Sequence, residues 1–307
     1  MGGGGDTDMD EETIAKYRLA GKAAAAGLRF GAGLIRDGAS ILEVVELTER
    51  HILDAGPGVG LAFPTNVAID DIAAHFTPLS DDRGLRFSRG QVVKLDCGAH
   101  VAGCIGDTAV TVEVGTSNYT DLVRASREAL EVALDMLAPR TNLTRVGEAV
   151  SGVIKGHGFA PIENLTGHSL EPYNLHAGLS VPNVPDPRAG VVQAGTAVAV
   201  EPFATDGRGR VDGKRPSHIY RVQRPGHAKG GDAGGLLAEA ERRFTSLPFA
   251  ERWCAPILRK PLPALRQLVR SGALYEYPIL GEIGNGIVSQ AESTVLVLDS
   301  GNIITTV

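Results

Sequence analysis

Cysteine is scarce in this sequence, and its few cysteines form no familiar pattern. Their number is odd and none of them share a CxxC spacing (Cys97, Cys104 and Cys254). A disulfide framework needs an even set, and a cysteine-based zinc site needs paired spacing. We therefore expect neither, and a reducing cytoplasm fits this cysteine usage best.

Long apolar runs are absent as well. No stretch reaches the roughly 18 residues that a membrane-spanning helix requires. The first residues, MGGGGDTDMDEE, are polar and acidic, whereas a secretory signal would be basic and then apolar. We expect the protein to stay in the cytoplasm, where it is made.

The overall amino-acid composition is typical of an ordinary folded protein. Hydrophobic residues make up 43% and charged residues 21% of the 307 positions, which argues against disorder and against a fibrous repeat. A chain of this length can bury a real core as one large domain or two modest ones.

Two kinds of segment predict the secondary structure. Alanine-rich or amphipathic segments indicate helices, with a capping box at Ser40 and Glu43 and a left-handed cap at Gly156. Short segments rich in Val, Ile and Thr indicate strands. No regular alternation of strand and helix is visible, so we expect an α+β fold. The expected helices are 10–35, 41–53, 120–137 and 144–155, and the expected strands are 91–100, 105–114, 196–205 and 287–298.

The charge is distributed unevenly along the chain. Residues 206–272 contain 14 Lys and Arg against 6 Asp and Glu, a net charge of +8, and the remaining residues carry 16 minus 30, or −14. This segment begins rich in Gly and Pro and ends in a helix opened by Pro261 and Pro263 and closed by Gly272. We interpret it as an insertion subdomain, with the catalytic domain formed by residues 1–205 and 273–307.

Four carboxylates interrupt apolar strands. Asp96 and Asp107 lie in neighbouring strand segments, Glu201 ends another and Glu292 interrupts a fourth. A buried charge of this kind is costly unless it is paired or binds a metal. If a tight turn falls at residues 101–103, Asp96 and Asp107 face each other across a hairpin at roughly 5 Å.

A histidine in the loop NLTGHSL, His168, adds a nitrogen donor to these four oxygen donors. Such a set suits Mn, Fe or Co. A pair of ions there would lower the pKa of a bridging water toward roughly 7 and polarise a peptide carbonyl, as hydrolysis requires. Each residue alone also has an ordinary structural explanation: a turn cap, a loop histidine, or a partner for an arginine.

Five blocks of sequence then carry a family resemblance over nearly the whole chain. In these blocks the chain resembles the type II methionine aminopeptidases, in particular the short archaeal form. The blocks, in order, are GLAFPTNVAIDDIAAHFTP (59–77), KLDCGAHVAGCIGDTAVTV (94–112), NLTGHSLEPYNLHAGLSVPN (164–183), AVEPFAT (199–205) and SQAEST (289–294).

The resemblance implies a role for each matching residue. Asp96 would hold one metal ion and His168 the other, Asp107 and Glu292 would bridge both, and Glu201 would be a ligand close to the transferred proton. It further implies two catalytic, substrate-binding histidines that are not ligands, and an apolar pocket for the methionine side chain. These residues are His75 and His176, and Phe63, Leu175 and Tyr277.

The same resemblance implies the fold, cofactors and partners. The fold would be the pita-bread fold with a type II helical insertion at residues 206–272. The cofactors would be two divalent ions per chain, from among Co, Mn, Fe, Ni and Zn. The substrates would be nascent proteins whose initiator methionine precedes a small residue, and we expect a monomeric enzyme.

The sequence departs from the family near the last ligand. The family commonly has Phe-Glu-His-Thr where this chain has Ala291, Glu292, Ser293 and Thr294, and an acidic residue often stands where this chain has Ala102. No ligand changes. Loss of the Phe and the His nonetheless predicts weaker support around Glu292, and such support can be worth 10- to 100-fold in metal affinity or activity.

Three other interpretations apply. An X-Pro metallopeptidase shares the fold and ligands but usually adds an N-terminal domain, for which this sequence has no room before residue 59. A non-catalytic pita-bread module that binds RNA or protein would lack metal ligands, and all five are present here. The basic insertion predicts transient contact with ribosomal RNA, with a merely solvated basic surface as the simpler explanation.

Overall fold

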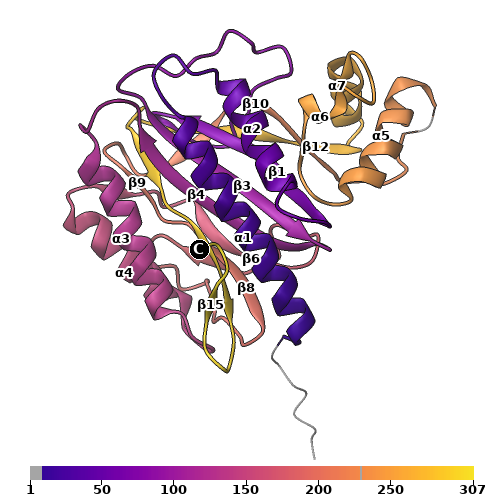
Figure 1. Cartoon of the computed structure of the whole chain (residues 1–307). Helices are drawn as coiled ribbons and strands as arrows, with labels where there is room; N and C mark the ends of the chain where they lie inside the picture. Colours follow the sequence, from indigo (N-terminus) through magenta and orange to yellow (C-terminus); the bar gives the residue numbers. More distant parts are fainter. Residues whose placement is uncertain (1–8, 229) are drawn as a thin grey trace, which may run out of the picture.

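The computed structural model describes residues 9–228 and 230–307. Its first layer is the antiparallel sheet β1-β3-β4, covered by two helices that lie across it (Figure 1). The bounds are β1 (Val59–Ile69), β3 (Val92–Val101), β4 (Cys104–Glu113), α1 (Glu11–Leu34) and α2 (Ile41–Leu53). Apolar side chains of both helices pack on Val93, Leu95 and Cys97 of β3.

Local sequence explains where the two helices begin. The Asp10 carboxylate accepts a hydrogen bond from the Thr13 N–H at 2.8 Å. The Ser40 hydroxyl accepts from the Glu43 N–H at 3.4 Å. Each bond satisfies a backbone donor that the first helical turn leaves without a partner. The predicted cap at Ser40 is therefore confirmed.

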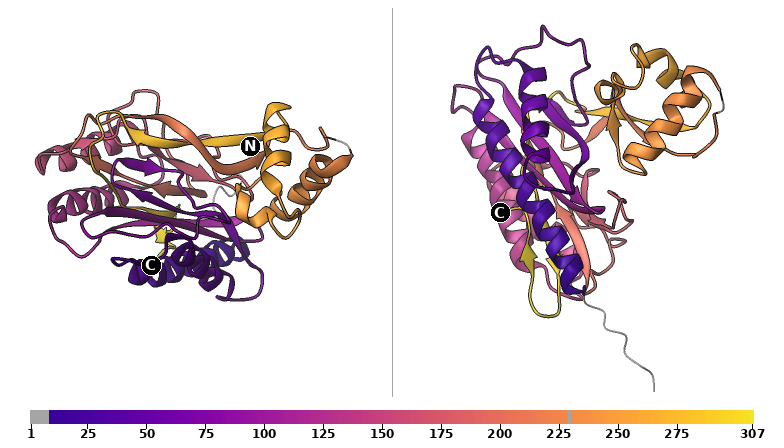
Figure 2. Two further views of the ribbon diagram at one scale, coloured as in Figure 1. Left: turned by 90° about the horizontal axis from the view of Figure 1, so that it is seen from above. Right: turned by 45° about the vertical axis from the view of Figure 1, so that its right-hand side comes forward.

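The second layer is built in the same way from later parts of the chain. A five-stranded sheet in the order β15-β14-β8-β6-β7 is covered by the helix pair α3 and α4. The bounds are α3 (Thr120–Met136), α4 (Leu143–Gly156), β6 (Thr166–Leu170), β7 (Ser180–Pro182), β8 (Thr196–Val200), β14 (Ser293–Val297) and β15 (Ile303–Ile304). In the left view of Figure 2, α1 and α2 lie along one side of the strands, and α3 and α4 lie at one end of them.

Two smaller sheets complete the fold. One has the order β13-β9-β5 and the other β11-β10-β12-β2. The bounds are β5 (Ala160–Pro161), β9 (Phe203–Thr205), β13 (Val288–Gln290), β2 (Ile72–Ala74), β10 (Val211–Val222), β11 (Phe249–Ala250) and β12 (Leu274–Glu282). The long pair β10 and β12 extends from the body of the molecule to its far end (Figure 1).

A helical lobe, residues 223–273, sits at that end between β10 and β12. It contains α5 (Gly231–Phe244), α6 (Glu251–Cys254) and α7 (Pro261–Arg270). Its apolar side chains form a separate core with Tyr220 and Leu274 of the two strands. Pro261 lies in the first turn of α7, and Gly272 follows the helix with φ 73°, as the sequence predicts. The division into domains at residues 205 and 273 stays a prediction.

The helix boundaries agree with the sequence except at the end of α4. Gly156 is the last helical residue, and the left-handed glycine is Gly158, with φ 85°. The Phe159 N–H reaches back to the Ile154 carbonyl at 3.2 Å and the Gly158 N–H to Lys155 at 2.9 Å. The helix therefore runs one residue further, and the cap at Gly156 is a wrong prediction.

Other sequence expectations concern the cysteines and the membrane. All three cysteines are buried free thiols. The Cys97 thiol donates to the Ala24 carbonyl of α1 at 3.6 Å, so it points toward the helix layer. Within residues 9–228 and 230–307, no helix has the length and apolarity to cross a membrane.

Candidate active site

The hairpin of β3 and β4 carries the two aspartates. Its two-residue turn is Ala102 and Gly103, with φ 48° and 87°, which matches the tight hairpin turn that needs positive φ at both positions. Asp107 pairs with Gly98, and Asp96 pairs with Ala109. The predicted direct pairing across the hairpin at 5 Å is therefore wrong.

The same register still places both aspartates on one face. They are diagonal neighbours two residues apart along the ladder, a separation of ~7–8 Å between backbone positions that side chains can bridge. Successive residues of a strand alternate faces, and an even offset keeps the two carboxylates together. The prediction was wrong because of the position of the turn. Direct pairing of Asp96 with Asp107 requires a hairpin centred one residue earlier than the observed turn at Ala102 and Gly103.

The two glutamates lie where strands break. β8 ends at Val200 and β9 begins at Phe203, so Glu201 stands between them. β13 ends at Gln290 and β14 begins at Ser293, which leaves Glu292 in the second gap. At Glu201 the chain passes from the five-stranded sheet to the three-stranded one, and at Glu292 it passes back from the three-stranded sheet to the five-stranded one. The expected continuous strands at 196–205 and 287–298 are therefore each two strands, with a carboxylate at the break.

Backbone hydrogen bonds fix Glu292 against the hairpin. The Glu292 N–H donates to the Ala109 carbonyl at 3.1 Å, and the Ala109 N–H donates back at 3.4 Å. The Thr108 hydroxyl donates to the Glu292 carbonyl at 2.9 Å. The Asp107 N–H donates to the Thr294 hydroxyl at 2.8 Å. These bonds join the first layer to the second at the position of the ligands.

A cavity of about 260 Å³ opens at this junction. Every residue that the sequence analysis assigned to the site lines it. Those residues are Phe63, His75, Asp96, Asp107, His168, Leu175, His176, Glu201, Tyr277 and Glu292.

The donor atoms of the expected ligands lie close together. The His168 Nε2 atom is 3.5 Å from a Glu201 oxygen and 3.9 Å from an Asp107 oxygen. Asp107, His168 and Glu292 each offer an atom within 4.8 Å of the others, a spacing that a metal ion can span. The Gln290 amide donates to both Glu201 and Glu292 at 3.4 Å.

Burial and mutual repulsion of the carboxylates favour a bound cation. Burial raises the pKa of Asp96 to about 7. Burial, and then the neighbouring carboxylates, raise the pKa of Asp107, Glu201 and Glu292 well above their ordinary values. One oxygen each of Asp96 and Asp107 is buried without a hydrogen-bond partner. Unpartnered buried oxygens in a like-charged cluster fit divalent ions that bind oxygen.

The histidines in the cavity are neutral. Burial, and then the neighbouring His176, lower the pKa of His168 to about 3, which leaves its ring free to bind a metal ion. Burial and then His75 lower the pKa of His176 to about 4. The rings of His168 and His176 lie 4.4 Å apart between centroids. The third ring, that of His75, approaches Tyr277 edge-on at 5.3 Å.

His75 is held in an unusual backbone conformation. Its φ of 65° lies in the left-handed region that residues other than glycine seldom adopt. Its Nδ1 atom lies 3.1 Å from the Pro278 carbonyl of β12. Strained residues of this kind are concentrated at functional sites. The geometry therefore fixes the direction of the His75 ring in the cavity.

One wall of the cavity is apolar. The Phe63 ring occupies space that exists because residue 98 is glycine, since a Cβ atom there would lie 2.3 Å from the ring. Ile219 of β10 and Pro248 line the cavity as well. Sequence reasoning missed these two, and also the polar lining residue Asn66. Only Asn66 left a signal, as a polar residue inside the apolar segment AFPTNVAI.

Comparison with known proteins identifies the family. The model of metallopeptidase family M24 matches residues 15–233. The chain is 41% identical to the methionine aminopeptidase of Archaeoglobus fulgidus over 298 residues, covering 97% of this chain and 100% of that protein. The chain belongs to family M24, among the archaeal-type methionine aminopeptidases. The methionine aminopeptidase of Methanocaldococcus jannaschii is 42% identical with the same coverage.

Solved structures agree in fold. A thermophilic Arx1 superposes with a TM-score of 0.85 at 18% identity, covering 97% of this chain and 91% of that one. The methionine aminopeptidase of Thermotoga maritima superposes with a TM-score of 0.70 at 24% identity, covering 97% and 98%. The pita-bread fold predicted from the resemblance is confirmed. So is the enzyme class: an M24 member is a metallopeptidase, which uses divalent metal.

Proposed function

We propose that this M24 enzyme removes the initiator methionine from nascent proteins when the next residue is small. The observation that carries the proposal is the buried donor set of four carboxylates and one imidazole beside an apolar cavity wall. This arrangement supports a binding site for hydrolytic metal ions next to a pocket for an unbranched side chain. Archaeal methionine aminopeptidases at 41% and 42% identity support the substrate.

The metal-binding roles follow the donor positions. Two divalent ions would be held by Asp96, Asp107, His168, Glu201 and Glu292, with Asp107 and Glu292 between them. When bound, such ions activate water and polarise a carbonyl. Their identity, from among Co, Mn, Fe, Ni and Zn, is best determined by anaerobic metal analysis with an activity titration. Two equivalents at full activity would support the pair, and saturation at one would count against it.

The remaining roles belong to the chain itself. Glu201, whose pKa is raised by burial, would hold the proton that passes from the attacking water to the departing amine. His176 is neutral and would donate a hydrogen bond to the substrate around its scissile peptide. His75 is neutral with its Nδ1–H on the Pro278 carbonyl, so its Nε2 would accept a hydrogen bond from the substrate. Phe63, Leu175 and Tyr277 would enclose the methionine side chain.

The sharpest test replaces the two bridging carboxylates. Asp107→Asn and Glu292→Gln should each abolish release of methionine from a Met-Gly peptide, because an amide cannot supply the charge that the ions need. Circular dichroism should show an intact fold. Thr116→Val, which alters an unrelated turn hydroxyl, serves as control. Full activity in either carboxylate variant would refute the assignment. An X-Pro enzyme would instead cleave Met-Pro peptides only.

We further propose a location and a partner. The enzyme would act in the cytoplasm as a monomer, and the segment 206–272, with its net charge of +8, would contact the ribosome transiently. Co-sedimentation with ribosomes at rising salt tests this contact. Binding that weakens with salt would support it, whereas no binding at low salt, or binding indifferent to salt, would leave the segment as a solvated basic surface.

A further inference from the structure

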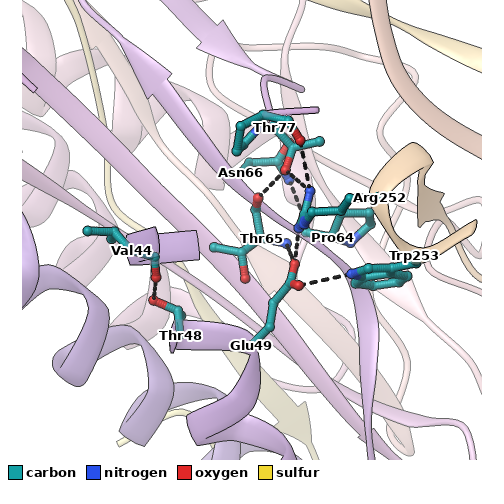
Figure 3. Close-up of polar contacts among 10 residues, drawn as sticks. Val44, Thr48, Glu49, Pro64, Thr65, Asn66, Thr77, Arg252 and Trp253 are labelled. Atoms are coloured by element: carbon teal, nitrogen blue, oxygen red, sulfur yellow. Dashed lines mark hydrogen bonds and ion pairs between the residues drawn. The ribbon is translucent and has the colours of Figure 1, made fainter. Parts of the chain in front are cut away.

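The helical lobe is joined to the body by a buried ion pair. Arg252 of α6 pairs with Glu49 of α2, and their side chains are only 3% and 8% exposed (Figure 3). The Trp253 indole N–H donates to the other Glu49 oxygen at 2.9 Å. Burial of such a pair requires further hydrogen bonds to compensate for lost water.

Those further bonds lead to one residue of β1. The Arg252 guanidinium donates to the Thr77 hydroxyl at 2.6 Å, and this hydroxyl donates to the Thr65 carbonyl at 2.8 Å. Glu49 accepts from the Thr65 N–H at 3.0 Å. Both backbone groups of Thr65 are therefore held by the cluster of Glu49, Thr77, Arg252 and Trp253, which we call the Arg252 cluster.

Thr65 lies where β1 departs from regular pairing. Phe63 pairs with Gly98 and Asn66 with Asp96, so three residues of β1 advance against two of β3. This irregularity removes Thr65 from the ladder, and the Arg252 cluster provides its partners instead. The flanking residues Phe63, Pro64 and Asn66 line the cavity.

The cluster also connects to the opposite wall. Arg252 donates to the Pro78 carbonyl at 3.3 Å, in the segment that follows His75. Glu251 accepts from the Ser80 N–H and hydroxyl at 3.0 and 3.1 Å. Pro248, three residues before Glu251, lines the cavity from the lobe side. The α6 segment thus holds the β1 wall, the His75 segment and the lobe wall in one arrangement.

We propose that Glu49 and Arg252 are positioning residues that set the width of the side-chain pocket and so its preference for methionine. This inference rests on the proposed function. Neither residue lines the cavity, and both act through Thr65 and Thr77. A rigid pocket excludes branched side chains because its walls cannot separate, and a loosened one admits them.

Substrate preference tests this role. Arg252→Lys keeps the charge but loses the planar fork that reaches three acceptors. We expect the ratio of kcat/KM for a methionyl over a leucyl peptide to fall about tenfold. The ratio does not depend on how much enzyme is folded, so a purely structural effect would leave it unchanged. Arg242→Lys alters an exposed ion pair of the same lobe and should keep the wild-type ratio.

A second variant covers the case in which Arg252→Lys does not fold. Thr77→Val removes the hydroxyl that joins Arg252 to Thr65 and keeps the side-chain shape. It should lower the ratio in the same direction, with metal content at the wild-type level. If Thr77→Val kept the wild-type ratio of kcat/KM for methionyl over leucyl peptide, whatever its stability, this inference would be overturned and the proposed function would stand. A wild-type enzyme that releases no methionine would overturn the proposed function as well.

Discussion

At the scale of single residues, the cavity combines groups that stabilise neither each other nor the metal-free fold. Four buried carboxyls with raised pKa values surround a histidine whose pKa is lowered. The left-handed His75 adds backbone strain. Such features persist only where the surrounding structure holds them. The cost of these buried carboxyls and of the strained His75 to the stability of the fold therefore indicates a functional site, and this cost can be measured.

His75 provides the first measurement. His75→Ala should lower kcat by roughly 10²-fold, because it removes the proposed hydrogen-bond partner that orients the substrate around its scissile peptide. Bound metal, measured by elemental analysis, should stay at the wild-type level, since the residue is assigned to substrate. A variant that loses its metal in parallel with its activity would contradict that role.

Asp96 provides a prediction about pH. Its pKa is about 7 in the folded protein and 3.8 in the ordinary reference, so the folded state binds more protons between these values. Stability of the metal-free protein therefore falls as pH rises through this window. Asp96→Asn removes that loss. The test measures both proteins with their metal removed by a chelator. The melting temperature of Asp96→Asn minus that of the wild type should increase from pH 5 to pH 8. A difference that stays constant over this range would contradict the assignment.

At the scale of elements, α1 packs closely on β4 and on the segment at Thr305, each time at a glycine. A Cβ atom at Gly106 would lie 2.4 Å from the Gly21 backbone, and one at Gly21 would lie 2.4 Å from the Thr305 carbonyl. Neither neighbour is a flexible side-chain end. The helix can therefore lie close to β4 only while residue 106 lacks a side chain, and close to Thr305 only while residue 21 lacks one.

The surroundings of the two glycines Gly21 and Gly33 of α1 predict opposite effects on stability when each is replaced by alanine. Gly21→Ala should destabilise the protein by about 1–3 kcal/mol, because it forces a backbone shift in packed structure. Gly33→Ala, where nothing lies within 4 Å, should stabilise it by up to about 1 kcal/mol through helix propensity. Urea denaturation of both variants checks the pair, and equal effects would contradict the close approach.

Much of this element structure could be predicted from the sequence. Helices α1 to α4 and α7 follow from local caps and periodicity, which act over a few residues. The change of sheet at Glu201 and at Glu292 could not be predicted, because the segments on either side of each carboxylate are apolar and give no sign of which sheet they join. The site residues were predicted from motif resemblance, whereas Asn66 and the Arg252 cluster depend on contacts between residues far apart in the chain.

At the scale of the whole molecule, the proposed ligands come from both layers. Asp96 and Asp107 belong to the first, and His168, Glu201 and Glu292 belong to the second. Metal bound between them should stabilise the folded chain by mass action, by about 2.7 kcal/mol at a hundredfold excess over Kd. Thermal unfolding with and without Mn or Co measures this gain. An unchanged melting temperature would argue against a metal site that joins the layers.

The bridge between Ala109 and Glu292 has a consequence for biosynthesis. Glu292 is the last of the five proposed ligands to be translated, and residues 293–307 follow it. The hairpin that carries the aspartates is complete before residue 115, and early segments of a chain can fold during translation. A ribosome-bound chain would therefore hold a partly formed, charge-rich site for most of its synthesis. Full metal affinity would arise only when the final strands emerge.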